Sequence, residues 1–186
     1  MEMKIRKYKP EDHDRIDEIC IETAREGLKT TPEMVEALTI VFSHYYTEQE
    51  PENVFVAVDD EDTAQGYILC ADDFGIWSEE FQERYLNDSQ NLPARMMGFG
   101  SVEALEPYAD EYPAHLHIDL MPSIQGQGVG TQLITALVEH LKARKIRGLI
   151  LDVAADNERA IRFYKKNGFQ VLHDDGDGIV MGMQLG

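Results

Sequence analysis

Positive charge is scarce in this sequence. Its 17 lysine and arginine residues stand against 35 aspartate and glutamate residues, so the formal net charge is −18. Such a surface repels phosphate backbones, and the mild basic cluster "KARKIR" at residues 142–147 falls at a helix end that favours positive charge anyway. We therefore expect no nucleic-acid partner. The acidic surface would attract a cationic small molecule or a basic peptide, although it also serves solubility.

Long apolar runs and cysteine clusters are missing as well. No 18 consecutive apolar residues occur, so we expect no transmembrane helix and no membrane partner. The first residues, "MEMKIRKYKPEDHD", lack the apolar core of a signal peptide. Cys20 and Cys70 form no CxxC motif, which favours buried thiols in a reducing compartment over a lone disulfide or a reactive pair. A cytoplasmic location is the expectation.

Segments with strand and helix periodicity follow one another along the chain. Strands are predicted at residues 3–8, 53–60, 66–73, 114–121, 147–154, 169–174 and 178–185, and helices at 10–26, 31–46, 130–145 and 156–168. The order strand, glycine turn, helix, strand over residues 115–153 is a βαβ unit, which predicts two parallel strands. No repeat or linker interrupts the pattern. The sequence therefore predicts one α/β (α+β) domain over residues 1–186, whose mixed central sheet has a parallel centre and flanking helices.

Residues 74–112 form an irregular, aromatic stretch with one predicted helix, around 78–87. Phe74, Trp77, Phe81 and Tyr85 are spaced as on one face of a helix. A helix covering the edge of the sheet would bury this stripe as core, which is the favoured interpretation. A lid over a substrate pocket and a homodimer contact are the alternatives.

Three glycines at alternate positions interrupt the segment "HIDLMPSIQGQGVGTQL" at residues 117–133. Gly126, Gly128 and Gly130 each cost backbone entropy, so something is expected to come close to the backbone there. A loop that leads into a helix presents unpaired N–H groups and the positive end of the helix dipole, which suits a phosphate. The alternative is a tight turn without a ligand.

The type of phosphate ligand can be narrowed by motif. No Gly-Lys-Ser or Gly-Lys-Thr occurs, which excludes a P-loop. The dinucleotide fingerprint GxGxxG matches at Gly126 and Gly128 but has Thr131 in the last position, while Asp152 stands about where a ribose-binding acid would. These two partial matches make a dinucleotide-dependent oxidoreductase the rival interpretation. Against it, too few residues follow Asp152 to complete a doubly wound sheet.

A closer match is to the GNAT N-acetyltransferase superfamily. The stretch from Gln125 to Gly130 resembles its acyl-CoA signature, (Arg or Gln)-x-x-Gly-x-(Gly or Ala), and "DNERAIRFYKKNGFQVL" resembles its second signature. The resemblance is firm over about residues 112–173, weaker over 1–72, and absent over 74–112. "YPAHLHIDLMP" is also similar to the acetyltransferase-like module of some O-GlcNAc hydrolases and its free-standing bacterial relatives.

This resemblance implies a GNAT fold over the whole chain, with an insertion at about 74–112, and acetyl-CoA as cosubstrate without a metal. The pyrophosphate would lie on the backbone amides of Gln125, Gly126, Gln127, Gly128, Val129, Gly130 and Thr131. The pantetheine arm would pair with Leu120 and Met121 like an added strand and touch Asn157. The Tyr164 hydroxyl would lie near the sulfur as a general acid. Taken alone, Asn157 is also a good N-cap and Tyr164 a plausible core aromatic.

His115, His117 and Asp119 alternate along one predicted strand and therefore share a face. An imidazole titrates near neutral pH, so this face offers a base for the attacking amine, with Asp119 orienting a histidine or holding an ammonium. A His-x-His pair on this strand also resembles the arylalkylamine acetyltransferases, with the register shifted by one residue. A metal site and a solvated sheet face are the alternatives.

The sequence therefore predicts an enzyme that transfers an acetyl group from acetyl-CoA to an amine by direct attack, with His117 or Asp119 as base and Tyr164 as acid. The acceptor would be a small-molecule amine or a basic peptide. An acyl-CoA-binding module without catalysis is the second rival.

Overall fold

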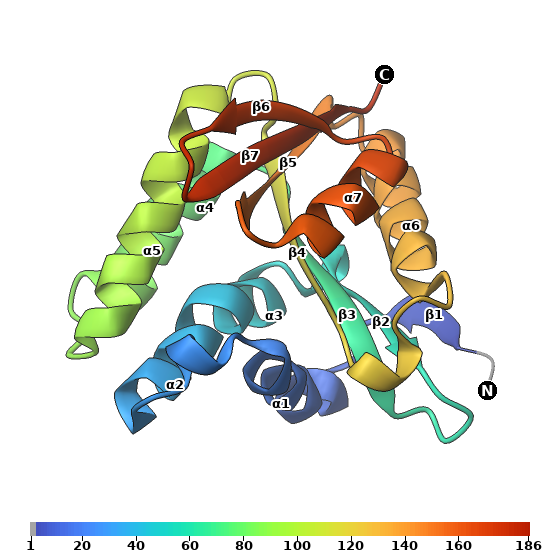
Figure 1. Cartoon of the computed structure of the whole chain (residues 1–186), viewed down its shortest axis with the longest axis horizontal. Helices are drawn as coiled ribbons and strands as arrows, with labels where there is room; N and C mark the ends of the chain where they lie inside the picture. The colour runs from blue at the N-terminus through green and yellow to red at the C-terminus, as the bar shows by residue number, and fades with distance from the viewer. Residues whose placement is uncertain (1–2) are drawn as a thin grey trace.

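The computed structural model of the chain describes residues 3–186 and has three layers (Figure 1). A seven-stranded sheet forms the middle layer. Helices α1 to α5 pack on one face and helices α6 and α7 on the other, each face burying its own apolar core. The strands are β1 (Lys4–Lys7), β2 (Phe55–Val58), β3 (Ala64–Ala71), β4 (Ala114–Leu120), β5 (Gly148–Ala154), β6 (Gln170–Asp174) and β7 (Gly178–Gln184).

The helices fall where the periodicity predicts them, with one addition. They are α1 (His13–Thr23), α2 (Pro32–Thr39), α3 (Tyr45–Gln49), α4 (Phe74–Phe81), α5 (Leu92–Leu105), α6 (Val129–Ala143) and α7 (Glu158–Lys166). A π-helical turn, η3 (Ile40–His44), joins α2 to α3, and a second, η5 (Gln82–Leu86), follows α4. The apolar side chains of α6 share one face and are buried against the sheet, with Leu133, Leu137 and Leu141 fully covered.

The strand order is β1-β2-β3-β4-β5-β7-β6, and only β4 and β5 pair in parallel. This arrangement confirms the predicted mixed sheet with a parallel centre. Strands β4 and β5 are paired only at Ala114↔Leu149 and His115↔Ile150, near the start of each strand. Beyond His115 the two strands separate, so the sheet opens in its middle toward the end of β4.

Residues 74–112 contain two helices, and the expected single helix around 78–87 was therefore incomplete. Helix α5 was missed because Pro93, Gly98 and Gly100 weaken its helical signal. Gly98 has a packing reason, because a Cβ there would lie 2.6 Å from a methyl carbon of Leu86. The aromatic stripe is core, since Trp77 is 1% exposed and Phe81 is fully buried.

Both cysteines are buried free thiols, as predicted. Among residues 3–186, no helix combines the length and apolar character needed to cross a bilayer.

Candidate active site

The glycine turn adopts a backbone conformation that most residues avoid. Gly126 and Gly128 have φ values of 78° and 83°, in the left-handed region. Gly128 is the N-cap of α6, so the unpaired N–H groups of the first turn of α6 follow directly. Gly130 has a different role, because a Cβ there would approach Phe163 Cζ to 2.8 Å. Two glycines shape the loop, and the third lets α6 pack against α7.

The loop borders a cleft of about 440 Å³ between the end of β4, α6 and α7. Its lining residues are Thr23, Ile118, Asp119, Leu120, Gln125, Gly126, Gly128, Gly130, Thr131, Asn157, Arg159, Ala160, Phe163, Tyr164 and Lys166. Most of the residues predicted from the two signatures thus meet in one place. Val129, the first residue of α6, is different. Its side chain is buried in the core between α6 and the sheet, so only its backbone amide is available to a ligand. Gln127 is exposed and donates from Nε2 to the Ser123 carbonyl at 2.7 Å.

The end of β4 presents backbone groups to this opening. Gly66 pairs with Leu120 across β3 and β4, and the Met121 N–H donates to the Gln65 carbonyl at 2.9 Å. Hydrogen-bonding direction alternates along an antiparallel pair, so the backbone of Leu120 and Ile118 faces away from β3, toward the gap. The N–H of Met121 is committed to β3. Gln125 Nε2 donates to the Leu120 carbonyl at 2.8 Å, which ties the loop to the strand.

Asn157 and Tyr164 lie two turns apart on α7 and both line the cleft. Asn157 is the N-cap, because its Oδ1 accepts from the Ala160 N–H at 3.2 Å. Tyr164 is 9% exposed. Burial, with a contribution from the nearby Asp119 carboxylate, raises the pKa of the Tyr164 hydroxyl. The hydroxyl is therefore protonated at neutral pH.

The two histidines of β4 share one partner. The Tyr46 hydroxyl lies 2.8 Å from His115 Nε2 and 3.0 Å from His117 Nε2. A hydroxyl carries one proton, so one imidazole donates to it and the other accepts from it. His117 therefore has only Nδ1 left for a substrate. Burial lowers the pKa of His117 to about 4 and that of His115 well below its ordinary value, so both rings are neutral at pH 7.

Asp119 lies on the same face of β4 and, unlike His115 and His117, is among the residues that line the cleft. The Tyr67 hydroxyl donates to its Oδ2 at 2.6 Å. Burial raises the pKa of the Asp119 carboxyl to about 6, against the opposing effect of that hydrogen bond. At neutral pH the carboxyl is mostly ionised, yet it is far more basic than an ordinary aspartate.

Asp119 and Tyr164 approach the cleft from opposite faces of the sheet. Asp119 points to the side that carries α1, whereas Tyr164 belongs to the apolar core on the α6 side. They meet because β4 and β5 separate at this level. The opened sheet thus brings a carboxylate and a neutral hydroxyl to one cavity.

Four residues that the sequence did not single out belong to this site. Arg159 and Lys166 line the cleft and supply positive charge that Gln125 lacks. Arg159 could have been noticed, because it stands two residues after Asn157 in the second signature. Tyr46 and Tyr67 come from α3 and β3, and no local motif marks them as partners of the β4 residues.

The description "Acetyltransferase (GNAT) family" fits residues 21–169 of the chain. The chain belongs to the GNAT acetyltransferase family, and the predicted family membership and fold are confirmed. Over 94 residues it is 35% identical to mycothiol acetyltransferase of Nocardia farcinica, covering 49% of this chain and 30% of that protein. It is also 23% identical to protein O-GlcNAcase of Rattus norvegicus, covering 97% of this chain and 22% of that protein. The chain thus spans less than a third of the length of these two relatives.

Solved structures show the same fold. The crystal structure of SsHAT superposes with a TM-score of 0.87 at 25% identity, and each chain is covered completely. PaiA N-acetyltransferase from Thermoplasma acidophilum, solved in complex with coenzyme A, superposes with a TM-score of 0.63 at 19% identity, with 99% of each chain covered.

Proposed function

We propose that this chain transfers an acetyl group from acetyl-CoA to an amine in the cleft between β4, α6 and α7. One observation carries the proposal: the cleft joins a glycine loop suited to a pyrophosphate with Asp119 and Tyr164 at its other end. The pyrophosphate would accept from the backbone amides of residues 125–131. Arg159 and Lys166 would supply the cations for it.

The pantetheine arm would lie against the open end of β4. Strand addition at an exposed sheet edge uses main-chain hydrogen bonds, and Ile118 and Leu120 turn their backbone groups to this opening. Since the Met121 N–H is bonded to Gln65 and the Leu120 carbonyl accepts from Gln125, we assign the pairing mainly to the Leu120 N–H and the backbone of Ile118. Asn157 would keep its capping bond through Oδ1 and use its amide Nδ2 on the arm.

The chemistry follows from the two titratable groups. A bound ammonium would first lose one proton to solvent, and the neutral amine nitrogen would then attack the thioester carbon while Asp119 takes the proton that the nitrogen releases as the carbon–nitrogen bond forms. The carbon–sulfur bond then breaks, and Tyr164 gives its proton to the departing thiolate. Asp119 is the better base because a carboxylate whose pKa is about 6 accepts a proton more readily than an imidazole whose pKa is about 4. His117, held by Tyr46, would position the acceptor through Nδ1.

The acceptor we propose is a cationic small-molecule amine or a basic peptide. The net charge of −18 and the carboxylate at the reacting end of the cleft both favour an ammonium group. The similar protein of Nocardia farcinica is named mycothiol acetyltransferase, which supports acetyl transfer as the reaction proposed for this chain.

The geometry does not favour a dinucleotide. Asp152, the candidate ribose-binding acid, lines a different hollow together with Tyr108 and Asp175, and it is not among the residues of the glycine cleft. A dinucleotide site needs both the glycine motif and an acid that binds the ribose, and Asp152 does not supply that acid in this cleft. Binding of acetyl-CoA without catalysis remains as an outcome of the test.

The test begins with the thermal stability of the purified chain in the presence of acetyl-CoA, CoA, NAD or NADP. A ligand at 100 times its dissociation constant adds about 2.7 kcal/mol to stability, or about 5–10 °C in Tm for a chain of this size. We expect a rise with acetyl-CoA and CoA, followed by release of free CoA thiol with at least one member of a panel of amines and basic peptides. A rise only with NAD or NADP would refute the proposal. Binding of acetyl-CoA without thiol release would leave a binding module.

A further inference from the structure

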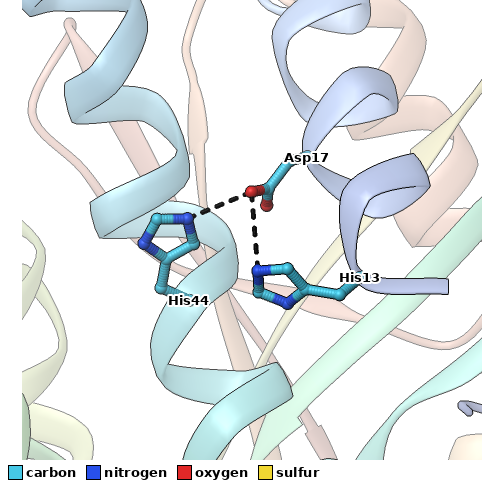
Figure 2. Close-up of side chains that lie close together, drawn as sticks. All are labelled: His13, Asp17 and His44. Atoms are coloured by element: carbon cyan, nitrogen blue, oxygen red, sulfur yellow. Dashed lines mark hydrogen bonds and ion pairs between the residues drawn. The ribbon is translucent and has the colours of Figure 1, made fainter. Parts of the chain in front are cut away.

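Away from the cleft, two imidazoles and one carboxylate converge on a single point. His13 and Asp17 lie one turn apart on α1, and His44 ends the π-helical turn η3. Figure 2 shows both imidazole rings directed at the same carboxylate oxygen. Asp17 Oδ2 lies 3.1 Å from His44 Nε2 and 3.8 Å from His13 Nε2. One ligand atom from each of the three residues lies within 4.8 Å of the other two.

The carboxylate is fixed in place by a neighbour. Ser43 donates its hydroxyl to Asp17 Oδ1 at 2.6 Å, and Ser43 itself is fully buried. This bond occupies one carboxylate oxygen and leaves Oδ2 directed at the two imidazoles. The rings of His13 and His44 stack with centroids 5.7 Å apart and an interplanar angle of 27°. The three groups are therefore arranged before anything binds between them.

We propose that His13, Asp17 and His44 bind one divalent transition-metal ion, with Zn²⁺ the best match. Two imidazole nitrogens and one carboxylate oxygen are donors that suit Zn²⁺, whereas Mg²⁺ and Ca²⁺ prefer all-oxygen sites. Tetrahedral ligands at about 2.1 Å from zinc lie about 3.4 Å apart. The observed separations of 3.1 Å and 3.8 Å bracket that value. The side chains are 32%, 22% and 26% exposed, so water can reach the fourth position.

Such an ion would be a structural brace rather than part of the acetyl-transfer site. It would link α1 to the segment η3–α3, which packs behind His117. Phe42 from η3 and Tyr46 from α3 each contact the His117 ring, with centroids 5.2 Å apart. Binding of the ion would therefore hold η3 and α3, whose residues contact His117, against α1.

The rival explanation is an ion pair that needs no metal, because protonated histidine can share the Asp17 carboxylate. Titration calorimetry of the full chain, freed of metal with a chelator and titrated with Zn²⁺ near pH 7.5, separates the two. We expect one Zn²⁺ per chain and a rise in Tm of about 5 °C at saturating ion. Absence of saturable binding would overturn the proposal.

Variants locate the ion. His13→Gln, Asp17→Asn and His44→Gln should each weaken Zn²⁺ binding at least tenfold. Ser43→Ala keeps all three ligands but releases the carboxylate, and it should weaken binding about tenfold. His173→Gln is the matched control, since this exposed histidine lies on β6, and its affinity should stay within twofold of the wild type. Wild-type affinity in His13→Gln and Asp17→Asn would overturn the assignment.

X-ray absorption of the Zn²⁺-loaded wild-type chain tests the same site without any substitution, so poor folding of a variant cannot decide the matter. Two imidazole ligands are expected in the spectrum. A zinc shell with one imidazole or none would refute the site.

Discussion

The two walls of the cleft are built in different ways. The loop wall consists of residues 120–131 with α7, and its binding groups come from two short continuous stretches of chain. The strand wall is Asp119 on β4, held by Tyr67 from β3. His117, held by Tyr46 from α3, lies two residues earlier on the same face of β4, next to this wall rather than in it. The loop wall presents mainly backbone amides, whereas the strand wall presents a half-buried titratable side chain.

This difference separates what each wall can do. Backbone amides held by left-handed glycines bind an anion without any change in protonation, which suits the constant part of a substrate. Burial raises the pKa of the Asp119 carboxyl to about 6, so this group can exchange a proton near neutral pH, which suits the reacting part. Substitutions in the loop wall should therefore act on acetyl-CoA affinity, and those in the strand wall on turnover.

The strongest expected effect falls on the strand wall, at Asp119. Asp119→Asn removes the proposed base and should lower kcat about 100-fold, with the dissociation constant of acetyl-CoA within twofold of wild type. In the wild type, kcat/KM should rise with pH through about 6, as the carboxyl ionises. Steady-state kinetics across pH 5–8 make the measurement. Asp177→Asn, in the exposed β6–β7 turn, is the control; unchanged turnover in Asp119→Asn would remove Asp119 as the base.

The next effect is expected at Tyr164, where the two walls meet. Tyr164→Phe keeps the ring and its packing but removes the proton offered to the thiolate, so kcat should fall at least about tenfold. The Tm should change by only a few degrees, because the aromatic ring stays in the core. Wild-type kcat in this variant would show that the thiolate leaves without help from Tyr164.

In the loop wall, Gly128→Ala should weaken acetyl-CoA binding about tenfold while kcat at saturation changes little. A non-glycine residue in the left-handed region costs about 1–2 kcal/mol, and the loop would relax away from the conformation that directs its amides. Gly27→Ala is the matched control, since Gly27 has no positive φ and no close neighbour. Calorimetric titration with acetyl-CoA compares the two variants. Equal affinities for acetyl-CoA would show that the left-handed conformation of Gly128 is not needed for binding.

A smaller effect is expected at Asn157, where capping and binding can be told apart. Asn157→Ala loses the cap of α7 and should cost about 1 kcal/mol of stability. Asn157→Asp keeps a capping oxygen but loses the amide donor, so it should retain the Tm and bind acetyl-CoA about threefold more weakly. Full affinity in Asn157→Asp would restrict this residue to the cap.

The pH dependence of stability gives a further contrast, between His117 and Asp119. The native pKa of His117, about 4, lies below its unfolded value, so its contribution to stability rises with pH between about 4 and 6.5. The native pKa of Asp119, about 6, lies above its unfolded value, so its contribution falls as pH rises from about 4 to 6. Denaturant unfolding should therefore show a steeper rise in stability with pH for Asp119→Asn than for His117→Gln. Equal slopes would contradict the assigned pKa shifts.

The loop wall could be predicted from the sequence because its determinants are local. Gly126, Gly128, Asn157 and Tyr164 stand in two compact signatures, and their spacing alone places them on a loop and on one helix face. The strand and helix order also predicted the sheet with its parallel centre, because the βαβ unit and the hairpins are consecutive in the chain.

The strand wall was only half predictable. Alternation put His117 and Asp119 on one face, but the tyrosines that hold them come from distant segments whose pairing depends on the complete fold. Those tertiary contacts also bury the two side chains. Burial lowers the pKa of His117 and raises that of Asp119, so the aspartate becomes the stronger base. Helix α5 escaped prediction for a related reason, since Gly98 is tolerated there only because Leu86 packs against it.

The separation of β4 from β5 leaves part of an internal strand without a neighbouring strand on one side. Ordinarily a strand at the centre of a sheet has both of its flanks satisfied, and only the outermost strands offer unpaired backbone to solvent. Here the open strand edge is internal, because β4 lies between β3 and β5 and the sheet has helices on both faces. A chain lying beside Ile118 and Leu120 would pair with a part of β4 that β5 does not reach. The ligand would then complete the architecture, and the fold would be most regular when it is loaded.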